Sequence, residues 1–178
     1  MNRLCSFMLF TLVSVAGIAQ ELEGENLLQG MPGGYKVGYQ VRQGDMLLVE
    51  MVPENETVED WSEMLTTQIF YGGLPVTTDV FYQRMASHWK KACNNADDQL
   101  IKTGEENGYP FTLWLLTCRD EETEITWFKA IKGNDSFYLV QKAWRREPAK
   151  EEITKWMPYL RSVTVCDTRI PESACAIE

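Results

Sequence analysis

Three stretches in the second half of the sequence carry large apolar side chains at consecutive positions, and this feature limits the fold more than any other. They are residues 109–118, 125–131 and 137–144. Successive side chains of an extended strand point to opposite faces, so Phe111 and Leu113 face one way while Trp114 faces the other. Water cannot be in contact with either face of such a strand. The sequence therefore predicts a sheet with a covering layer on each side.

Short polar segments separate these stretches and indicate how the strands are connected. Residues 120–123 and 133–135 join the last three strands, and both have a composition typical of hairpin turns. Alternating side chains over residues 35–41 and 46–52 predict an earlier hairpin. With a further strand around residues 99–102, the sequence predicts about six antiparallel strands.

Three segments have apolar side chains at helical spacing and are the predicted covering layers. The first spans residues 57–70, the second spans residues 78–94, and the third begins at Pro148. Pro158 removes one backbone donor and clashes with the preceding turn, so we expect the third helix to end or bend near Met157. The predicted fold is α+β, with a central antiparallel sheet sandwiched between helices.

The first nineteen residues have the pattern of a secretory signal peptide. Arg3 supplies a positive charge, residues 4–15 are almost wholly apolar, and small residues follow up to Ala19, where we expect cleavage. The apolar run is shorter than the roughly 20 residues that span a bilayer, so we predict no membrane span. The predicted organisation is a signal peptide over 1–19, a flexible acidic and Gly-rich lead-in over 20–34, and one α+β domain over 35–178.

Export also sets the expected state of the cysteines. Cys5 leaves with the signal peptide, and Cys93, Cys118, Cys166 and Cys175 remain. An even number of cysteines in an exported chain indicates two disulfides. Three pairings are possible, and the sequence alone does not choose among them, but Cys166 with Cys175 closes a short loop and leaves Cys93 for Cys118. No CxxC pair is present, which argues against a zinc site and a redox-active dithiol.

Charge and histidine content narrow the classes of ligand. The chain has 17 Lys and Arg against 26 Asp and Glu, with a formal net charge of −9. Nucleic acids and anionic membranes attract basic surfaces, so we expect no nucleic acid and no membrane as partner. The single histidine excludes a multi-histidine metal site, and the acidic segment 120–124 lacks the spacing of a calcium loop. We therefore expect no metal and no cofactor.

Two candidates for functional chemistry remain. His88 is the only imidazole, but it lies at the edge of the apolar stripe of the second helix, which favours a packed and hydrogen-bonded side chain. The one basic and aromatic cluster of this acidic chain is formed by Trp144, Arg145, Arg146, Lys150 and Lys155. Trp and Arg often carry the energy of protein interfaces, so this cluster is a candidate interaction patch. The alternative is an edge strand that charge protects from pairing.

The order of the predicted elements resembles that of the PsbP and Mog1 families: two strands, two helices, four strands and a helix. Residues 61–64, 133–138, 140–143 and 166–169 also resemble segments of exported proteobacterial proteins without an assigned activity. The resemblance implies a periplasmic or secreted protein whose fold serves elsewhere to bind partner proteins or to assist assembly. It offers no catalytic residue to carry over.

The sequence thus predicts a non-catalytic periplasmic or secreted module that binds another envelope or secreted protein through the sheet edge and the candidate interaction patch. The alternative is a small-ligand carrier, or an enzyme that works through carboxylates and His88, with an apolar pocket between sheet and helices.

Overall fold

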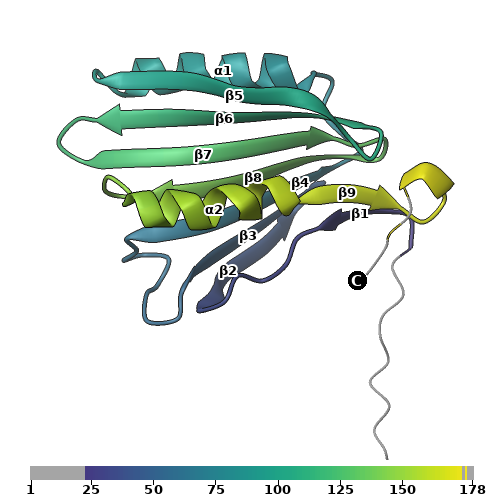
Figure 1. Ribbon diagram of the computed structural model, residues 1–178, viewed down its shortest axis with the longest axis horizontal. Coiled ribbons are helices and arrows are strands. Elements are labelled where there is room, and N and C mark those ends of the chain that lie inside the picture. The colour runs from purple at the N-terminus through teal and green to yellow at the C-terminus, as the bar shows by residue number, and fades with distance from the viewer. Residues whose placement is uncertain (1–22, 174, 176–178) are drawn as a thin grey trace, which may run out of the picture.

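The computed structural model describes residues 23–173 and 175, and its main element is a seven-stranded antiparallel sheet with one helix on each face (Figure 1). In spatial order the strands are β2 (Tyr35–Gln43), β3 (Met46–Pro53), β4 (Glu63–Tyr71), β8 (Ser136–Trp144), β7 (Thr123–Lys132), β6 (Tyr109–Arg119) and β5 (Ala96–Glu106). The predicted α+β class and the antiparallel sheet between helices are confirmed, with seven strands in the sheet instead of about six.

The three strands with apolar side chains on both faces lie inside the sheet, as their composition requires. Trp114 of β6 and Phe128 of β7 stack with ring centroids 5.1 Å apart on the face that α1 covers. Leu113 and Val140 face the other side, where Trp156 of α2 packs. All five side chains are buried, so the core consists of two apolar layers separated by the sheet.

Helix α1 (Thr78–Ala92) confirms the second predicted helix. Thr77 caps its first turn, because the side-chain oxygen accepts the backbone N–H of Val80 at 3.2 Å. The apolar stripe faces the sheet, and Trp89 meets the ring of Phe128 edge-on at 6.2 Å. In Figure 1 the helix lies behind β5, and its contacts are with β5, β6 and β7, so it covers the part of its face that is nearest to β5.

The helix predicted over residues 57–70 is wrong, because most of this segment forms strand β4. Leu65, Thr67 and Ile69 lie at alternate positions on the face that α2 covers. The apolar spacing of such a short segment is compatible with a strand as well as with a helix. Pairing decides between the two: β4 lies between β3 and β8 and forms hydrogen-bonded ladders with both. Contacts with strands distant in the sequence therefore override the local spacing.

Helix α2 (Lys150–Ser162) confirms the third predicted helix. It does not end near Met157, because it continues through Pro158, and the alternative of a bend there stays a prediction. The proline cannot donate to the carbonyl of Thr154, and both residues are exposed, so water can bond this carbonyl. The buried side chains on either side of the proline are Trp156 and Leu160. Their packing on the sheet holds both halves of the helix. Among the described residues, no helix is long and apolar enough to span a membrane.

The structure places a strand inside the segment that we expected to be a flexible lead-in over residues 20–34. Strand β1 (Glu25–Leu28) pairs antiparallel with β9 (Thr164–Asp167) in a separate two-stranded sheet, and a short 3-10 helix, η1 (Pro171–Ser173), follows β9. Order thus begins before the predicted first hairpin. The predicted signal peptide over residues 1–19 lies outside the described residues and stays a prediction.

The two disulfides pair as the short-loop argument favoured, which confirms both. Cys93 at the end of α1 bonds Cys118 of β6, and Cys166 of β9 bonds Cys175. The first bond ties a helix to the sheet beneath it, and the second closes the C-terminal segment onto β9. Two disulfides in a chain of this size fit an oxidising compartment.

Two lysines are buried beneath α2, and each supports one part of the helix. Lys129 lies at its C-terminal end, where the ammonium group donates to the carbonyls of Arg161 at 3.2 Å and Val163 at 2.7 Å. It also pairs with Glu106 at 2.6 Å. This lysine thus satisfies helix-end carbonyls that have no partner within the helix.

The second buried lysine, Lys142, lies beneath the middle of α2. Its ammonium group donates to the hydroxyl of Tyr35 and to a carboxylate oxygen of Glu63, both at 2.7 Å, and lies 4.1 Å from the ring centroid of Trp156. Burial lowers the pKa of Lys142 to about 8, although Glu63 favours the charged form. Burial also raises the pKa of Tyr35 well above its ordinary value, so its hydroxyl stays protonated while Lys142 titrates.

Replacing Lys142 with Met should change how stability depends on pH. Between about pH 8 and about pH 10 the unfolded chain keeps the proton of Lys142 while the folded chain loses it, because the folded pKa is the lower one. The unfolded state then binds more protons, so the free energy of unfolding contributed by this group rises with pH. We expect urea titrations to show the wild type gaining about 2 kcal/mol relative to Lys142→Met across this window. Parallel pH profiles for the two proteins would contradict the assignment.

Candidate functional site

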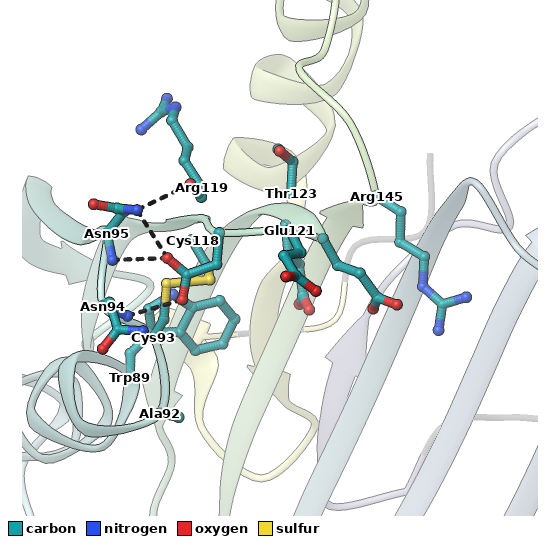
Figure 2. A pocket seen from close by; sticks show the side chains of 13 residues that line it. Trp89, Ala92, Cys93, Asn94, Asn95, Cys118, Arg119, Glu121, Thr123 and Arg145 are labelled. Atoms are coloured by element: carbon teal, nitrogen blue, oxygen red, sulfur yellow. Dashed lines mark hydrogen bonds between the residues drawn. A yellow bond between two sulfur atoms is a disulfide. The ribbon is translucent and has the colours of Figure 1, made fainter.

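A hollow of about 810 Å³ lies where the C-terminal end of α1 meets the turn between β6 and β7 (Figure 2). Its lining comes from three parts of the chain: residues of 89–95, residues 118–124 and Arg145. The sheet brings these parts together, because β6 ends where β7 begins, and β8 ends at the same end of the strands. In Figure 1 this end of the sheet is on the left, and β1 and β9 are at the opposite end.

The Cys93–Cys118 disulfide and the ring of Trp89 line the hollow (Figure 2). Asp120 offers a carboxylate oxygen close to both sulfur positions, but the sulfurs are bonded to each other and are not available to a metal. A thiolate at Cys93 would also face the negative end of the α1 dipole and the carboxylate of Asp120. These charges disfavour thiol–disulfide exchange, so we interpret this disulfide as a structural bond.

The carboxylate of Asp120 joins the β6–β7 turn to the residues that follow α1. It accepts the backbone N–H of Asn94 at 2.9 Å, the backbone N–H of Asn95 at 3.0 Å and the side-chain amide of Asn95 at 3.0 Å. The hydrogen bond from the Asn94 backbone is the main cause that lowers the pKa of Asp120 below its ordinary value. One wall of the hollow is therefore held by an ionised side chain and a disulfide together.

A second hollow of about 520 Å³ adjoins the first, because both are lined by Glu121, Glu122, Thr123 and Arg145. Arg145 lies at the junction, with its guanidinium 4.1 Å from the ring centroid of Trp61. Its backbone N–H donates to the carbonyl of Ser62 at 2.9 Å. We call the two hollows and the Trp61–Arg145 pair the end surface.

The charges of the end surface are unevenly paired. Arg119 forms an ion pair with Glu147 at 2.6 Å. Among the described residues, no carboxylate lies within ion-pairing distance of Arg145. Glu121 and Glu122 are exposed on the same turn and have no basic partner within the described part of the chain. The end surface thus offers one free cation beside free carboxylates.

The structure divides the candidate interaction patch that the sequence predicts. Trp144 has no exposed surface and belongs to the core, so its place in a binding patch is wrong. The edge-strand alternative is wrong too, because β8 lies between β4 and β7. Arg146 is exposed but holds both carboxylate oxygens of Glu152 at 2.6 Å. Lys150 and Lys155 are exposed on α2 and do not line the hollows. Only Arg145 and Arg146 reach the end surface.

The structure does not support a catalytic role for His88. We expected a packed and hydrogen-bonded side chain, but His88 is exposed on α1, and none of the hydrogen bonds of the described residues involves its ring. It lines neither of the two hollows. The helical spacing placed His88 at the edge of the apolar stripe of α1 and therefore suggested burial. The stripe is narrower than the spacing indicates, and Ala86 is its most buried member among residues 79–92.

Trp61 is the residue of the end surface that the sequence analysis missed. Its spacing relative to Val58 and Met64 suggested the apolar side of a helix, whereas the structure places it in the loop before β4, half-buried under Arg145. The signal that could have identified it is a tryptophan among acidic and polar neighbours, Glu59, Asp60 and Ser62. Tryptophan is enriched among the residues that dominate the energy of protein interfaces.

No protein-family model and no curated protein sequence matches the chain. Among solved structures, the chain is similar to the solution structure of cyanobacterial PsbP (CyanoP) from Synechocystis sp. PCC 6803. The sequence identity is 11% and the TM-score is 0.43, over 85% of this chain and 95% of that chain. The resemblance to exported proteobacterial proteins stays a prediction.

Replacing Asp120 with Ala should loosen the wall of the first hollow without unfolding the chain, because the Cys93–Cys118 bond remains. The amides of Asn94 and Asn95 lose their acceptor. We expect both amides to exchange hydrogen several-fold faster than in the wild type, while amides of β7 keep their rates. Exchange read by NMR checks this, and unchanged rates at both asparagines would show that Asp120 does not hold the wall.

Proposed function

We propose that the mature chain is a non-catalytic binding module of the periplasm or the extracellular space, which holds another envelope or secreted protein at the end surface. The observation that carries the proposal is Arg145, which is exposed, has no carboxylate partner among the described residues and lies at the junction of two hollows. The two disulfides support an exported location, because such bonds persist in oxidising compartments.

The composition and order of the end surface favour a protein as its partner. Tryptophan and arginine are enriched among the residues that dominate the energy of protein interfaces. Arg145 is already held by the ring of Trp61 and by its backbone bond to Ser62, so binding costs little side-chain entropy. An interface of this kind needs no enclosed cavity. Glu121 and Glu122, which line both hollows, are exposed to solvent.

The charges of the end surface indicate what the partner must offer. Arg145 needs a carboxylate, while Glu121 and Glu122 need basic groups a short distance away. Opposite charges arranged in this way fix the orientation of two proteins and raise their association rate. A partner with both signs of charge on one surface therefore fits better than a uniformly basic one.

The sheet edges are a less suitable binding surface than the sequence analysis expected. Both edge strands contain a register shift, between Val37 and Tyr39 in β2 and between Leu100 and Lys102 in β5. Bulges of this kind interrupt the regular row of backbone donors and acceptors that a further strand would need. We therefore assign partner binding to the end surface and not to a sheet edge.

The alternative of a ligand carrier or an enzyme with a pocket between sheet and helices has less support. The gap between α2 and the sheet, lined by residues such as Trp127, Ile153 and Met157, leaves no space for a water molecule. The side chain of His88 lines neither of the two hollows. A ligand site beneath α2 would require this helix to move away from the sheet.

Charge reversal at Arg145 should abolish binding of the partner and cost little stability, because Arg145 is exposed, forms no ion pair with the described residues and loses only its contact with the Trp61 ring. The matched control is Arg84→Glu, which makes the same charge change at an exposed position of α1 outside both hollows. The measurement is cross-linking of the tagged mature protein in its own host, followed by mass spectrometry. We expect one stoichiometric partner with the wild type and Arg84→Glu, and none with Arg145→Glu.

Arg146→Glu is not a clean test, because it also breaks the pair with Glu152 at the start of α2. Thermal unfolding of each variant shows whether the fold is intact. A partner that Arg145→Glu still captures at wild-type yield would place the binding surface elsewhere, and the absence of any partner with the wild type would favour the carrier alternative.

A further inference from the structure

A cradle for a carboxylate group lies at the turn between β7 and β8, at the opposite end of these strands from the end surface. Three consecutive backbone N–H groups and one hydroxyl converge there on the side chain of Glu25. The donors are Asn134 at 2.6 Å, Asp135 at 3.2 Å and Ser136 at 3.1 Å through their backbones, and the Tyr138 hydroxyl at 3.0 Å. A nest of this kind selects a negatively charged oxygen group.

The turn is built to admit the carboxylate. A Cβ atom at Gly133 would lie 2.1 Å from a carboxylate oxygen of Glu25, closer than any real contact. Only glycine therefore leaves the space that the carboxylate fills. Its backbone N–H is bonded to the carbonyl of Ser136 at 2.9 Å, which closes the turn and directs the next three N–H groups toward the ligand.

Two other carboxylates lie close to the cradle, and an arginine neutralises them. Asp135 and Asp167 both pair with the guanidinium of Arg169. Without Arg169 they would repel a third carboxylate at this place. The neighbouring charges are thus arranged so that the cradle accepts an anion although the chain as a whole is acidic.

The cradle is one part of the space that β1 fills beside β9, and we call this space the groove. Strand β1 pairs antiparallel with β9, from Glu25 opposite Asp167 to Leu28 opposite Thr164. Side chains two apart on a strand share a face, and Leu27 accordingly packs against the hydrophobic core on the α2 side of the sheet. The groove therefore recognises a carboxylate followed two residues later by a large apolar side chain.

The occupant of the groove is a short strand with a single strand neighbour, since β1 has four residues and pairs with β9 only. Gln29 marks its anchored base, because Thr67 donates to its side-chain oxygen at 2.8 Å and its side-chain amide donates to Tyr159 at 3.1 Å. β1 can therefore lift from β9 about this base while the seven-stranded sheet stays intact.

We propose that the groove formed by β9 and the β7–β8 turn is an acceptor site for an extended segment of a partner protein, with a carboxylate two residues before a large apolar side chain. β1 fills this site with the chain's own Glu25 and Leu27, and the partner segment displaces it. The groove and its occupant supply the evidence for complementarity, and this inference does not depend on the end surface.

The test uses the mature chain with Glu25→Lys and Leu27→Asp, two changes that weaken β1 and leave every donor of the cradle in place. The probe is a fluorescent peptide with the sequence of residues 22–29. We expect fluorescence anisotropy to show binding about tenfold tighter to this variant than to the wild type, whose site is occupied.

A peptide with Gln in place of Glu should bind about tenfold more weakly, because an amide presents a donor to the backbone donors. Adding Gly133→Ala to the variant should remove binding, since the new Cβ occupies the carboxylate position.

Hydrogen exchange of the wild type provides the second measurement and does not depend on the folding of any variant. We expect the amides of β1 to exchange at least about tenfold faster than those of β6, and faster still with excess peptide, because the peptide traps the displaced state. Three results would overturn the proposal: a folded variant that does not bind the peptide, equal binding of the Glu and Gln peptides, or β1 amides that exchange as slowly as the core and do not respond to peptide.

Discussion

The burial of both faces of three neighbouring strands is the constraint on which the rest of this structure depends. Trp114 stacks on Phe128 beneath α1, while Leu113 and Val140 form the opposite layer with Trp156 of α2. One helix on each face is too narrow to cover seven strands. Of the two edge strands, β5 is therefore polar along most of its length, and β2 is almost wholly exposed. Bulges in both edge strands prevent them from pairing with other sheets. The two candidate surfaces lie at the two ends of the central strands, where turns and helix ends meet.

Burial of cations under α2 is a second consequence of the same arrangement. The sheet places Lys129 and Lys142 on the face that α2 covers, and each becomes fully buried. A buried charge is tolerated only when it is paired and hydrogen-bonded. Glu106 and Glu63 provide the pairs, and the last carbonyls of α2 or the hydroxyl of Tyr35 provide the remaining acceptors. Lys129 bonds the last carbonyl groups at the C-terminal end of α2, and Lys142 lies against the ring of Trp156. Both lysines therefore add directional contacts to the apolar packing of the helix.

The sequence predicted those parts of the fold that local chemistry determines. Apolar runs on both faces identified the central strands, the apolar stripe identified α1, and loop length favoured the disulfide pairing that is present. The prediction from sequence was wrong where contacts between distant segments determine the structure. Most of the segment 57–70 forms strand β4, because β3 and β8 lie on either side of it. Trp144 and Arg145 are adjacent in sequence, yet one is in the core and the other is exposed, because β8 ends between them. The partnership of Trp61 with Arg145 depends on the same pairing of β4 with β8 and could not be found from spacing.

The two ends of the sheet use one chemical device in two different ways. At each end a carboxylate binds backbone N–H groups of a distant segment: Asp120 holds the residues after α1, and Glu25 is held by the β7–β8 turn. Asp120 belongs to a turn that the Cys93–Cys118 bond has already fixed, so its hydrogen bonds add rigidity to a place that has little freedom. Glu25 belongs to a short strand that no covalent bond ties to its neighbours. The same interaction therefore adds rigidity at one end, while at the other end it is the contact that the proposed displacement of β1 would break.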